Sequence, residues 1–516
     1  MSGYELRNIN ENDNRKRKQD EVGPESDHPE VVFVDSSSRR PVGLGDSPLG
    51  TKPVDSYRLV FIILLVHGIG TLMPWNMFIN ANDYFADHKL SPNYIASGEE
   101  TGLSKAEVAE LRKNFLSYLT IVAQVPNVIF NGLNLIVNLG SGNLKLRVNL
   151  MLFVEGLIFL LTIILVVVDS SKWPNAFFYI TMGSVVVLNM ASGVYQNCIF
   201  GTGAKFPGTY TNAILIGSNF SGTFTSTVNL LTTWMAPDPK QAALYYFITA
   251  LFIIVICIVS YNLLPLIRFF RFYDQLDNQQ PAEEDTKLES FKRVTSETSA
   301  TLKNNNDDVP DNFRKTVDAM VPKSTQPDDE NDGSYLSELQ HKWNVFKQCW
   351  PQLLNVFLTF HVTLALFPAV LANTHQLQGW FDEKYFSPFS CFFIFNLFAL
   401  IGNLLSGLTT WPGRDYVWIL VVVRFLFLPF FLFCNFNPTS RHWPVYVSSD
   451  LAFIFGNVLL ALSSGYLSSL CMIFSSSNLS PNDAPKAGML AAFFLVFGIF
   501  TGVSSSSLLT KLVEMG

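Results

Sequence analysis

The sequence predicts an all-α protein that crosses a membrane many times. Of its 516 residues, 49% are hydrophobic and only 15% are charged, a composition far from that of a soluble protein. Charges gather in residues 1–58, 83–113 and 266–347, and the rest reads as apolar runs of roughly 20 residues, the length that crosses a bilayer. Because no short apolar stretch with a cleavage site opens the chain, we expect the first helix to direct insertion.

Eleven apolar segments have the pattern of transmembrane helices. They span residues 57–81, 114–138, 148–169, 176–201, 207–233, 242–266, 349–372, 387–410, 415–435, 449–474 and 486–510. Six lie before a long polar segment and five after it, which resembles the two helical bundles of major-facilitator carriers. We therefore expect a major-facilitator-like 6 + 5 arrangement, although the sequence holds no strong internal repeat.

One polar region precedes the helices at 57–266, and a second separates them from the helices at 349–510. Residues 1–56 and 267–348 cannot bury enough apolar surface to fold, so we expect a disordered cytoplasmic tail and a disordered cytoplasmic loop. Within the loop, Lys292-Arg293-Val294-Thr295-Ser296 fits a kinase that prefers basic sites. A solvated charge run without a regulatory role is the alternative interpretation.

Basic residues near the helix ends predict the orientation. With a cytoplasmic N-terminus, the cytoplasmic side collects Lys52, Arg58, Lys145, Arg147, Lys205, Arg268, Arg271, Lys342, Lys347, Arg414 and Lys486. An odd number of helices then places the C-terminus outside. The stretch Asp46-Ser47-Pro48-Leu49 matches only part of an acidic dileucine sorting signal, so we expect the plasma membrane rather than an internal one.

The first apolar segment is too unusual for a plain lipid anchor. Residues 65–78 include two glycines, a proline, a tryptophan and an asparagine, where an anchor needs only leucine and valine. On one helix, four residues at i, i+3, i+4 and i+7 share a face: Leu72, Trp75, Asn76 and Ile79. A face with an aromatic ring and an amide suits a polar ligand with a flat ring.

Polar residues recur in other apolar segments, where a helix that faced only lipid would not use them. They are Gln196 in the fourth segment, Asn212 and Asn219 in the fifth, and Asn396 and Asn403 in the eighth, on one face with Phe392 and Ala399. For each amide, an interhelical hydrogen bond that only holds the bundle together is the alternative interpretation.

Four ionisable residues also fall inside the apolar segments. We expect Glu155 and Arg424 to face protein or water, and His67 and His361 to be neutral and hydrogen-bonded in the bundle, with a proton relay as the alternative. The six cysteines show no paired metal spacing and are expected to be core residues. Because enzyme motifs are absent, we expect neither enzymatic activity nor a cofactor.

Several motifs together resemble the equilibrative nucleoside transporter family. The first is Gly68-Ile-Gly-Thr-Leu-Met-Pro-Trp-Asn76, and the fifth segment adds Phe206-Pro-Gly-Thr-Tyr210, Gly217 and Ser221-Gly222. The match continues with Ser390-Cys-Phe392, Phe395-Asn396, Trp411-Pro-Gly413, Cys434-Asn435 and Gly465-Tyr-Leu-Ser-Ser-Leu-Cys471. The resemblance covers nearly all of residues 57–510.

The resemblance implies an eleven-helix uniporter that lets nucleosides cross the plasma membrane down their gradients by alternating access, with no nucleic-acid partner. Carried over by position, the implied substrate-binding residues are Leu72, Trp75, Asn76, Ile79, Gln196, Phe367, Phe392 and Asn396. On the eighth helix the family usually has an aspartate and, four residues later, an arginine, where this sequence has Ala399 and Asn403. We expect Asn396 and Asn403 to meet the sugar hydroxyls instead.

Two alternatives remain open at the level of function. One is a diverged carrier for nucleobases or another small organic solute. The other is a membrane receptor or scaffold that does not transport and that docks partners through residues 267–348. Ligand binding without flux would favour the receptor.

Overall fold

Helices account for almost all of the chain that the computed structural model describes, which is residues 53–81, 83–91, 93–95, 105–136, 144–235, 238–275, 330–379 and 382–515. Within these ranges, the one β-type contact is an isolated bridge between Thr374 and Phe436. The kinase segment Lys292–Ser296, the partial sorting signal at Asp46 and nearly all of the predicted tail lie outside the described residues.

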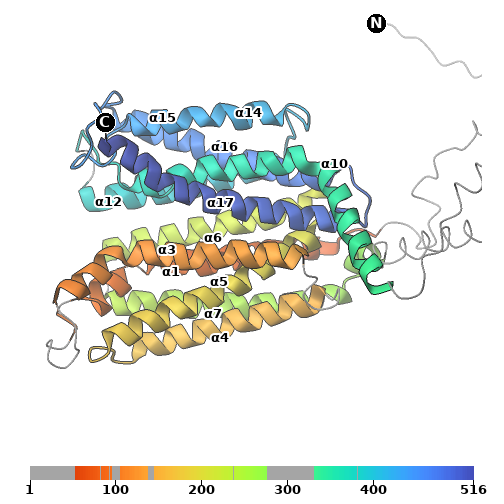
Figure 1. Ribbon diagram of the computed structural model, residues 1–516, viewed down its shortest axis with the longest axis horizontal. Helices are drawn as coiled ribbons and strands as arrows, with labels where there is room; N and C mark the ends of the chain where they lie inside the picture. The colour runs from red at the N-terminus through yellow and green to blue at the C-terminus, as the bar shows by residue number, and fades with distance from the viewer. Residues whose placement is uncertain are drawn as a thin grey trace, which may run out of the picture. The chain divides into compact units, whose positions relative to one another are not determined.

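Helices occupy all eleven predicted ranges (Figure 1). The first half contains α1 (Leu59–Asn80), the π-helix η3 (Asp83–Lys89), α3 (Lys105–Ile136), α4 (Leu144–Val167), α5 (Pro174–Ala204), α6 (Gly208–Met235) and α7 (Pro239–Leu263). The second half contains α10 (Glu330–Leu366), α11 (Ala369–Ala372), α12 (Glu383–Ser387), the π-helix η5 (Pro388–Phe393), α13 (Ile394–Ser406), α14 (Val417–Val423), α15 (Phe427–Leu432), α16 (Asp450–Ser476) and α17 (Ala484–Met515).

Nine helical segments of the described chain are long and apolar enough to cross a membrane. The helix α6, which is rich in Ser, Thr and Asn, is not among them, and the apolar segment Val417–Leu432 is shorter than the others. The all-helical membrane fold is thus confirmed, and the count of eleven crossings stays a prediction.

Two helices extend well beyond the predicted apolar segments. The helix α3 begins at Lys105 rather than 114, and α10 begins at Glu330 within the region predicted to be a disordered loop. In both extensions one face of the helix is apolar and packs inward, because Val108 and Val345 are buried while their charged neighbours Glu110 and Lys347 face solvent. Hydropathy alone missed these amphipathic turns.

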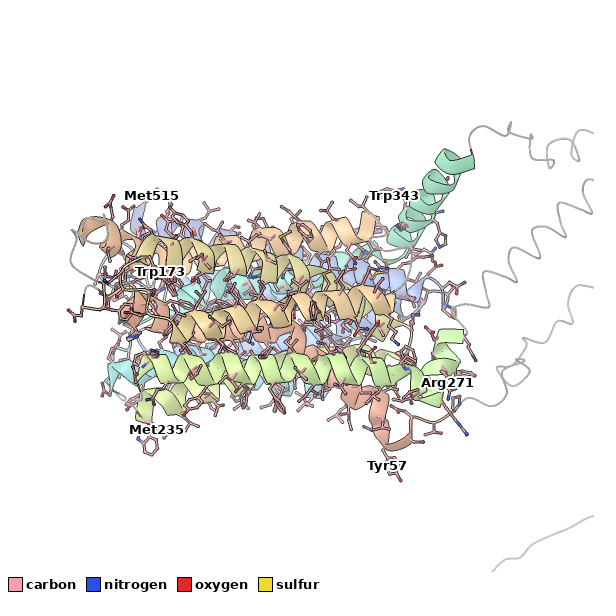
Figure 2. All side chains as sticks on the ribbon, turned by 90° about the horizontal axis from the view of Figure 1, so that it is seen from below. Tyr57, Trp173, Met235, Arg271, Trp343 and Met515 are labelled. Atoms are coloured by element: carbon pink, nitrogen blue, oxygen red, sulfur yellow. The ribbon has the colours of Figure 1, made fainter. Side chains whose placement is uncertain are left out.

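Successive long helices run in opposite directions, so the segments that connect them gather at the two ends of the helical bundle (Figure 2). Tyr57, Arg271 and Trp343 lie at one end of the helices, and Trp173, Met235 and Met515 lie at the other. The end with Trp343 also carries the described basic residues of the orientation prediction: Arg58, Lys145, Arg147, Lys205, Arg268, Arg271, Lys342, Lys347, Arg414 and Lys486. Lys52 lies outside the described residues.

Each half contains two helix pairs in which a glycine touches the backbone of its partner. In the first half, Gly217 of α6 lies against Leu65 O of α1, and a Cβ on Gly193 of α5 would lie 2.5 Å from Asn127 O of α3. In the second half, a Cβ on Gly498 of α17 would lie 2.6 Å from Phe357 O of α10, and Gly465 of α16 lies against the backbone of α13. The packing therefore repeats between the halves where the sequence does not.

The ionisable residues inside the helices face protein, as predicted. Arg424 is 2% exposed and donates to Thr359 O at 3.0 Å and to Thr363 Oγ1 at 2.7 Å. Glu155 is fully buried, and neither carboxyl oxygen has a hydrogen-bond partner among the described residues. His67 Nδ1 lies 2.7 Å from Tyr195 Oη, and His361 Nδ1 lies 3.0 Å from Thr501 Oγ1, so both histidines are hydrogen-bonded in the bundle. All six cysteines are buried thiols.

Candidate substrate site

A cavity lies between the two halves, and we call it the central cavity. Its volume is about 160 Å³. Helices of both halves line it, among them α1, α3, α5 and α6 from the first and α10, α13, α16 and α17 from the second. Eight of the nine predicted site residues line it: Leu72, Trp75, Asn76, Ile79, Gln196, Phe367, Phe392 and Asn396.

The polar side of this cavity begins on α1 and α6, which the glycine contact brings together. Asn76 Nδ2 donates to Ser221 Oγ at 3.2 Å, and Thr71 Oγ1 lies 3.2 Å from Ser218 Oγ. These bonds fix the rotation of α1, so Trp75 and Asn76 both line the cavity. The predicted face of the first helix is therefore the face that lines the cavity.

A second wall of the cavity, formed by η5, α13 and the end of α10, is aromatic. The rings of Phe367 and Phe395 stack with centroids 4.0 Å apart, and Phe392 meets Phe367 edge-on at 5.7 Å. Asn396 Nδ2 donates to Phe392 O at 2.9 Å, and its Oδ1 packs against Gly222, where any side chain would collide with it. The cavity thus offers a flat ligand both aromatic rings and amides.

Several amides in the cavity are not used by the protein. Gln196 is 7% exposed, and no group in the described part of the chain hydrogen-bonds its side chain. Asn127 Oδ1 is buried without a partner in the same part of the chain. Because buried polar groups left unpaired are costly, these groups favour a ligand with complementary donors and acceptors.

Among the described residues, no charged side chain lines the central cavity. A buried cation behind the cavity wall, Arg424, donates to Thr363 Oγ1, which lies 3.0 Å from Ser464 Oγ in that wall. A charged ligand would have no counter-ion here and would lose its hydration without compensation. The cavity therefore fits a neutral, polar, ring-containing molecule.

Comparisons with known proteins agree with this geometry. Residues 182–511 match a family model described as "Nucleoside transporter". The chain is 31% identical over 479 residues to human equilibrative nucleoside transporter 1, covering 90% of this chain and 99% of that one. It belongs to the nucleoside transporter family. Human equilibrative nucleoside transporter 2 is 34% identical over 475 residues, with the same coverage of 90% and 99%.

A solved structure supports the fold assignment of this nucleoside transporter family member. The major facilitator superfamily proton:xylose symporter XylE, bound to 6-bromo-6-deoxy-D-glucose, superposes with a TM-score of 0.53 at 10% identity. The superposition covers 89% of this chain and 90% of that one. The predicted major-facilitator-like fold is confirmed, and the prediction that the chain is a transporter rather than an enzyme follows from the family.

Asn403, the ninth predicted site residue, does not line the central cavity. It is fully buried, its Nδ2 donates to Leu215 O at 2.8 Å, and its Oδ1 accepts from Ser469 Oγ at 3.2 Å. Asn403 therefore joins α13 to α6 and α16, and we leave it out of the proposed site. Ala399, on the same face, is also buried against a neighbouring helix, since its carbonyl oxygen touches Gly465.

The structure adds site residues that the sequence prediction omitted. They are, among others, Gln124 and Asn127 on α3, Asn189 and Ser192 on α5, and Thr363, Ser464 and Ser468 in the second half. A signal for the α3 pair was present, because Gln124, Asn127, Asn131 and Asn134 lie at i, i+3, i+7 and i+10.

Proposed function

We propose that the central cavity binds nucleosides and that the protein carries them down their gradient by alternating access of its two halves. The observation that carries the proposal is a cavity whose described lining combines aromatic rings with unpaired amides and includes no charged side chain. A nucleoside offers a flat base for stacking and neutral edges and hydroxyls for hydrogen bonds.

We assign roles to the site residues on this basis. Trp75 and the Phe367–Phe392 wall stack on the base, and Gln196 hydrogen-bonds its edge. Asn76 and Asn396, with Leu72 and Ile79 beside them, meet the ribose. Without a carboxylate and a guanidinium, ribose recognition rests on neutral hydrogen bonds of about half the strength of charge-assisted ones.

Uptake measurements test this function. In cells that lack nucleoside transport, expression of this protein should give saturable uptake of labelled uridine and adenosine. Excess unlabelled nucleoside should compete with this uptake, and collapse of the sodium and proton gradients should leave it unchanged. Absence of saturable uptake of either nucleoside, despite protein at the cell surface, would contradict the proposal.

We further propose that the protein acts in the plasma membrane with its N-terminus in the cytoplasm and its C-terminus outside. The support is the distribution of Lys and Arg. Ten lie at the described helix ends that share a side with Tyr57 and Trp343, against nine at the other end, and residues 1–52 and 276–329, which the prediction assigns to the first side, add fifteen in sequence. Cytoplasmic loops of membrane proteins carry such an excess of Lys and Arg. Phosphorylation of the 267–348 region by a kinase stays a prediction from sequence.

A further inference from the structure

A second cavity lies at the end of the helices that carries Trp343, and we call it the basic cavity. Its volume is about 560 Å³, and none of its described lining residues also lines the central cavity. The ends of α3 and α4 line it from the first half, together with Lys205 beyond α5, and α10 and α17 line it from the second. The proposed transport function makes no use of it.

Four cations line the basic cavity: Arg147, Lys205, Lys342 and Lys486. No carboxylate is among the lining residues that the structure describes. Lys205 Nζ pairs with Asp274 at 2.8 Å and Lys486 Nζ with Asp483 at 3.4 Å, and both of these carboxylates lie outside the cavity lining. The net field within the cavity stays positive, which favours an anionic ligand.

Arg147 is the lining residue that most strongly favours an anionic ligand in the basic cavity. Its side chain is only 8% exposed, and Nη1 donates to Asn134 Oδ1 at 3.0 Å. Its Nε is buried and has no partner among the described residues, nor does a carboxylate contact the guanidinium there. A buried, unpaired cation is costly, and an anion in the cavity would offset that cost.

The remaining walls of the basic cavity are apolar. The rings of Trp343 and Phe346 stack at 5.1 Å, and Phe346 stacks on Phe494 at 6.2 Å. Phe493 fits beside α3 because Gly132 has no side chain: a Cβ there would lie 3.0 Å from the ring. The apolar wall continues onto the outer surface through Ile136 and Trp343, which are 52% and 54% exposed.

We propose that the basic cavity binds an anionic phospholipid, with the phosphate at Arg147 and an acyl chain along the Phe346, Phe493 and Phe494 wall. A soluble phosphate compound would match the cations but would leave the apolar wall and its exposed continuation uncovered. Basic pockets between transmembrane helices at the membrane interface are suited to such headgroups. The proposal concerns binding and does not depend on the transported substrate.

Lipid binding to the purified full-length protein tests the proposal. By native mass spectrometry, dioleoylphosphatidylglycerol should bind more tightly than dioleoylphosphatidylcholine, which has the same chains but no net charge. Arg147→Gln and Lys342→Gln should each weaken phosphatidylglycerol binding about fivefold, from a contribution of roughly 1 kcal/mol per basic residue. Lys511→Gln, the same type of change at the other end of α17, should not.

Three outcomes would overturn the proposal. The first is equal binding of the two lipids by the wild-type protein. The second is unchanged phosphatidylglycerol binding in both Arg147→Gln and Lys342→Gln. The third is displacement of the lipid by millimolar uridine monophosphate or inorganic phosphate, which would assign the cavity to a soluble anion. The Lys342→Gln variant keeps the test valid if Arg147→Gln does not fold.

Discussion

At the scale of single residues, Trp75 is the side chain on which base recognition depends most. It lines the central cavity from α1, facing the space that the phenylalanine wall closes. We expect Trp75→Ala to raise the KM for uridine roughly 5- to 160-fold, since base stacking on an aromatic ring contributes about 1–3 kcal/mol. Trp75→Phe should recover part of the loss in uptake assays. Trp418→Ala is the control, because that ring is 53% exposed on α14, away from the cavity.

Asn396 and Asn403 provide a second test, because one asparagine lines the central cavity and the other binds neighbouring helices. Asn403→Ala removes bonds to Leu215 O and Ser469, so we expect a loss of roughly 1–3 kcal/mol in stability and a lower melting temperature with an unchanged KM. Asn396→Ala should instead raise KM a few-fold with little change in melting temperature. A raised KM in Asn403→Ala would return Asn403 to the binding site.

These two residues also show how far sequence can predict a site. Helical periodicity correctly placed Asn396 and Asn403 on one face, because they are seven residues apart. Periodicity carries no information about depth along the helix axis. Near Asn396 the neighbouring helix offers Gly222 and a cavity, whereas near Asn403 it offers a backbone carbonyl. Whether such an amide is free to bind a ligand or bonds to a neighbouring helix thus depends on helices that are distant in sequence.

At the scale of helices, the contact between α1 and α6 fixes one wall of the central cavity. The glycines Gly68 and Gly217 place these two backbones in direct contact. We expect Gly217→Ala to force the helices apart, lowering both the melting temperature and the amount of folded protein, at a cost of about 1–3 kcal/mol. Gly183→Ala on α5 is the matched control, because a Cβ there meets nothing within 4 Å. Equal effects of the two substitutions would contradict this explanation.

The π-helix η3 at the other end of the molecule carries a buried lysine whose charge is pH-dependent. Lys89 is 2% exposed and donates to Val168 O at 2.6 Å. Burial, with a smaller contribution from the positive charge of Lys240, lowers the pKa of Lys89 from 10.5 to about 8. Between pH 8 and pH 10.5, Lys89 is protonated in the unfolded chain but largely deprotonated in the folded protein. Its contribution to the free energy of unfolding therefore rises with pH in this range.

A comparison of melting temperatures measures this effect. The difference between wild type and Lys89→Met should increase from pH 7.5 to pH 10, in favour of the wild type. Lys172→Met, on the same side of the membrane and exposed, should show no such trend. A constant difference across this pH range would mean that Lys89 stays charged in the folded protein.

Helix positions were predictable from the sequence, but several helix ends were not. Hydropathy located all eleven helices because runs of apolar residues are its direct signal. The first turns of α3 and α10 leave the apolar region, and there only one face is buried. Their length is decided by tertiary packing, such as Trp343 and Phe346 against Phe494, which no local pattern reports.

At the scale of the whole molecule, the two halves share a plan of packing that their sequences conceal. The pair α1–α6 corresponds in this plan to α10–α17, and α3–α5 corresponds to α13–α16, each joined through glycine. Between the halves, side-chain bonds such as Asn197 Nδ2 to Met489 O and Asn212 Nδ2 to Asn403 O accompany one close glycine contact, in which a Cβ on Gly488 of α17 would lie 2.6 Å from Phe200 O of α5. Alternating access needs strong joints within halves and breakable joints between them.

The complete burial of the six thiols makes the wild-type protein a ready background for site-directed labelling. A water-soluble maleimide should leave it unmodified until it unfolds. A cysteine introduced at exposed Ser477, at the end with Trp343, should then react with an impermeant reagent only in broken cells. One at exposed Thr439, at the end with Met515, should react in intact cells. The reverse pattern would invert the proposed orientation without any native cysteine having been removed.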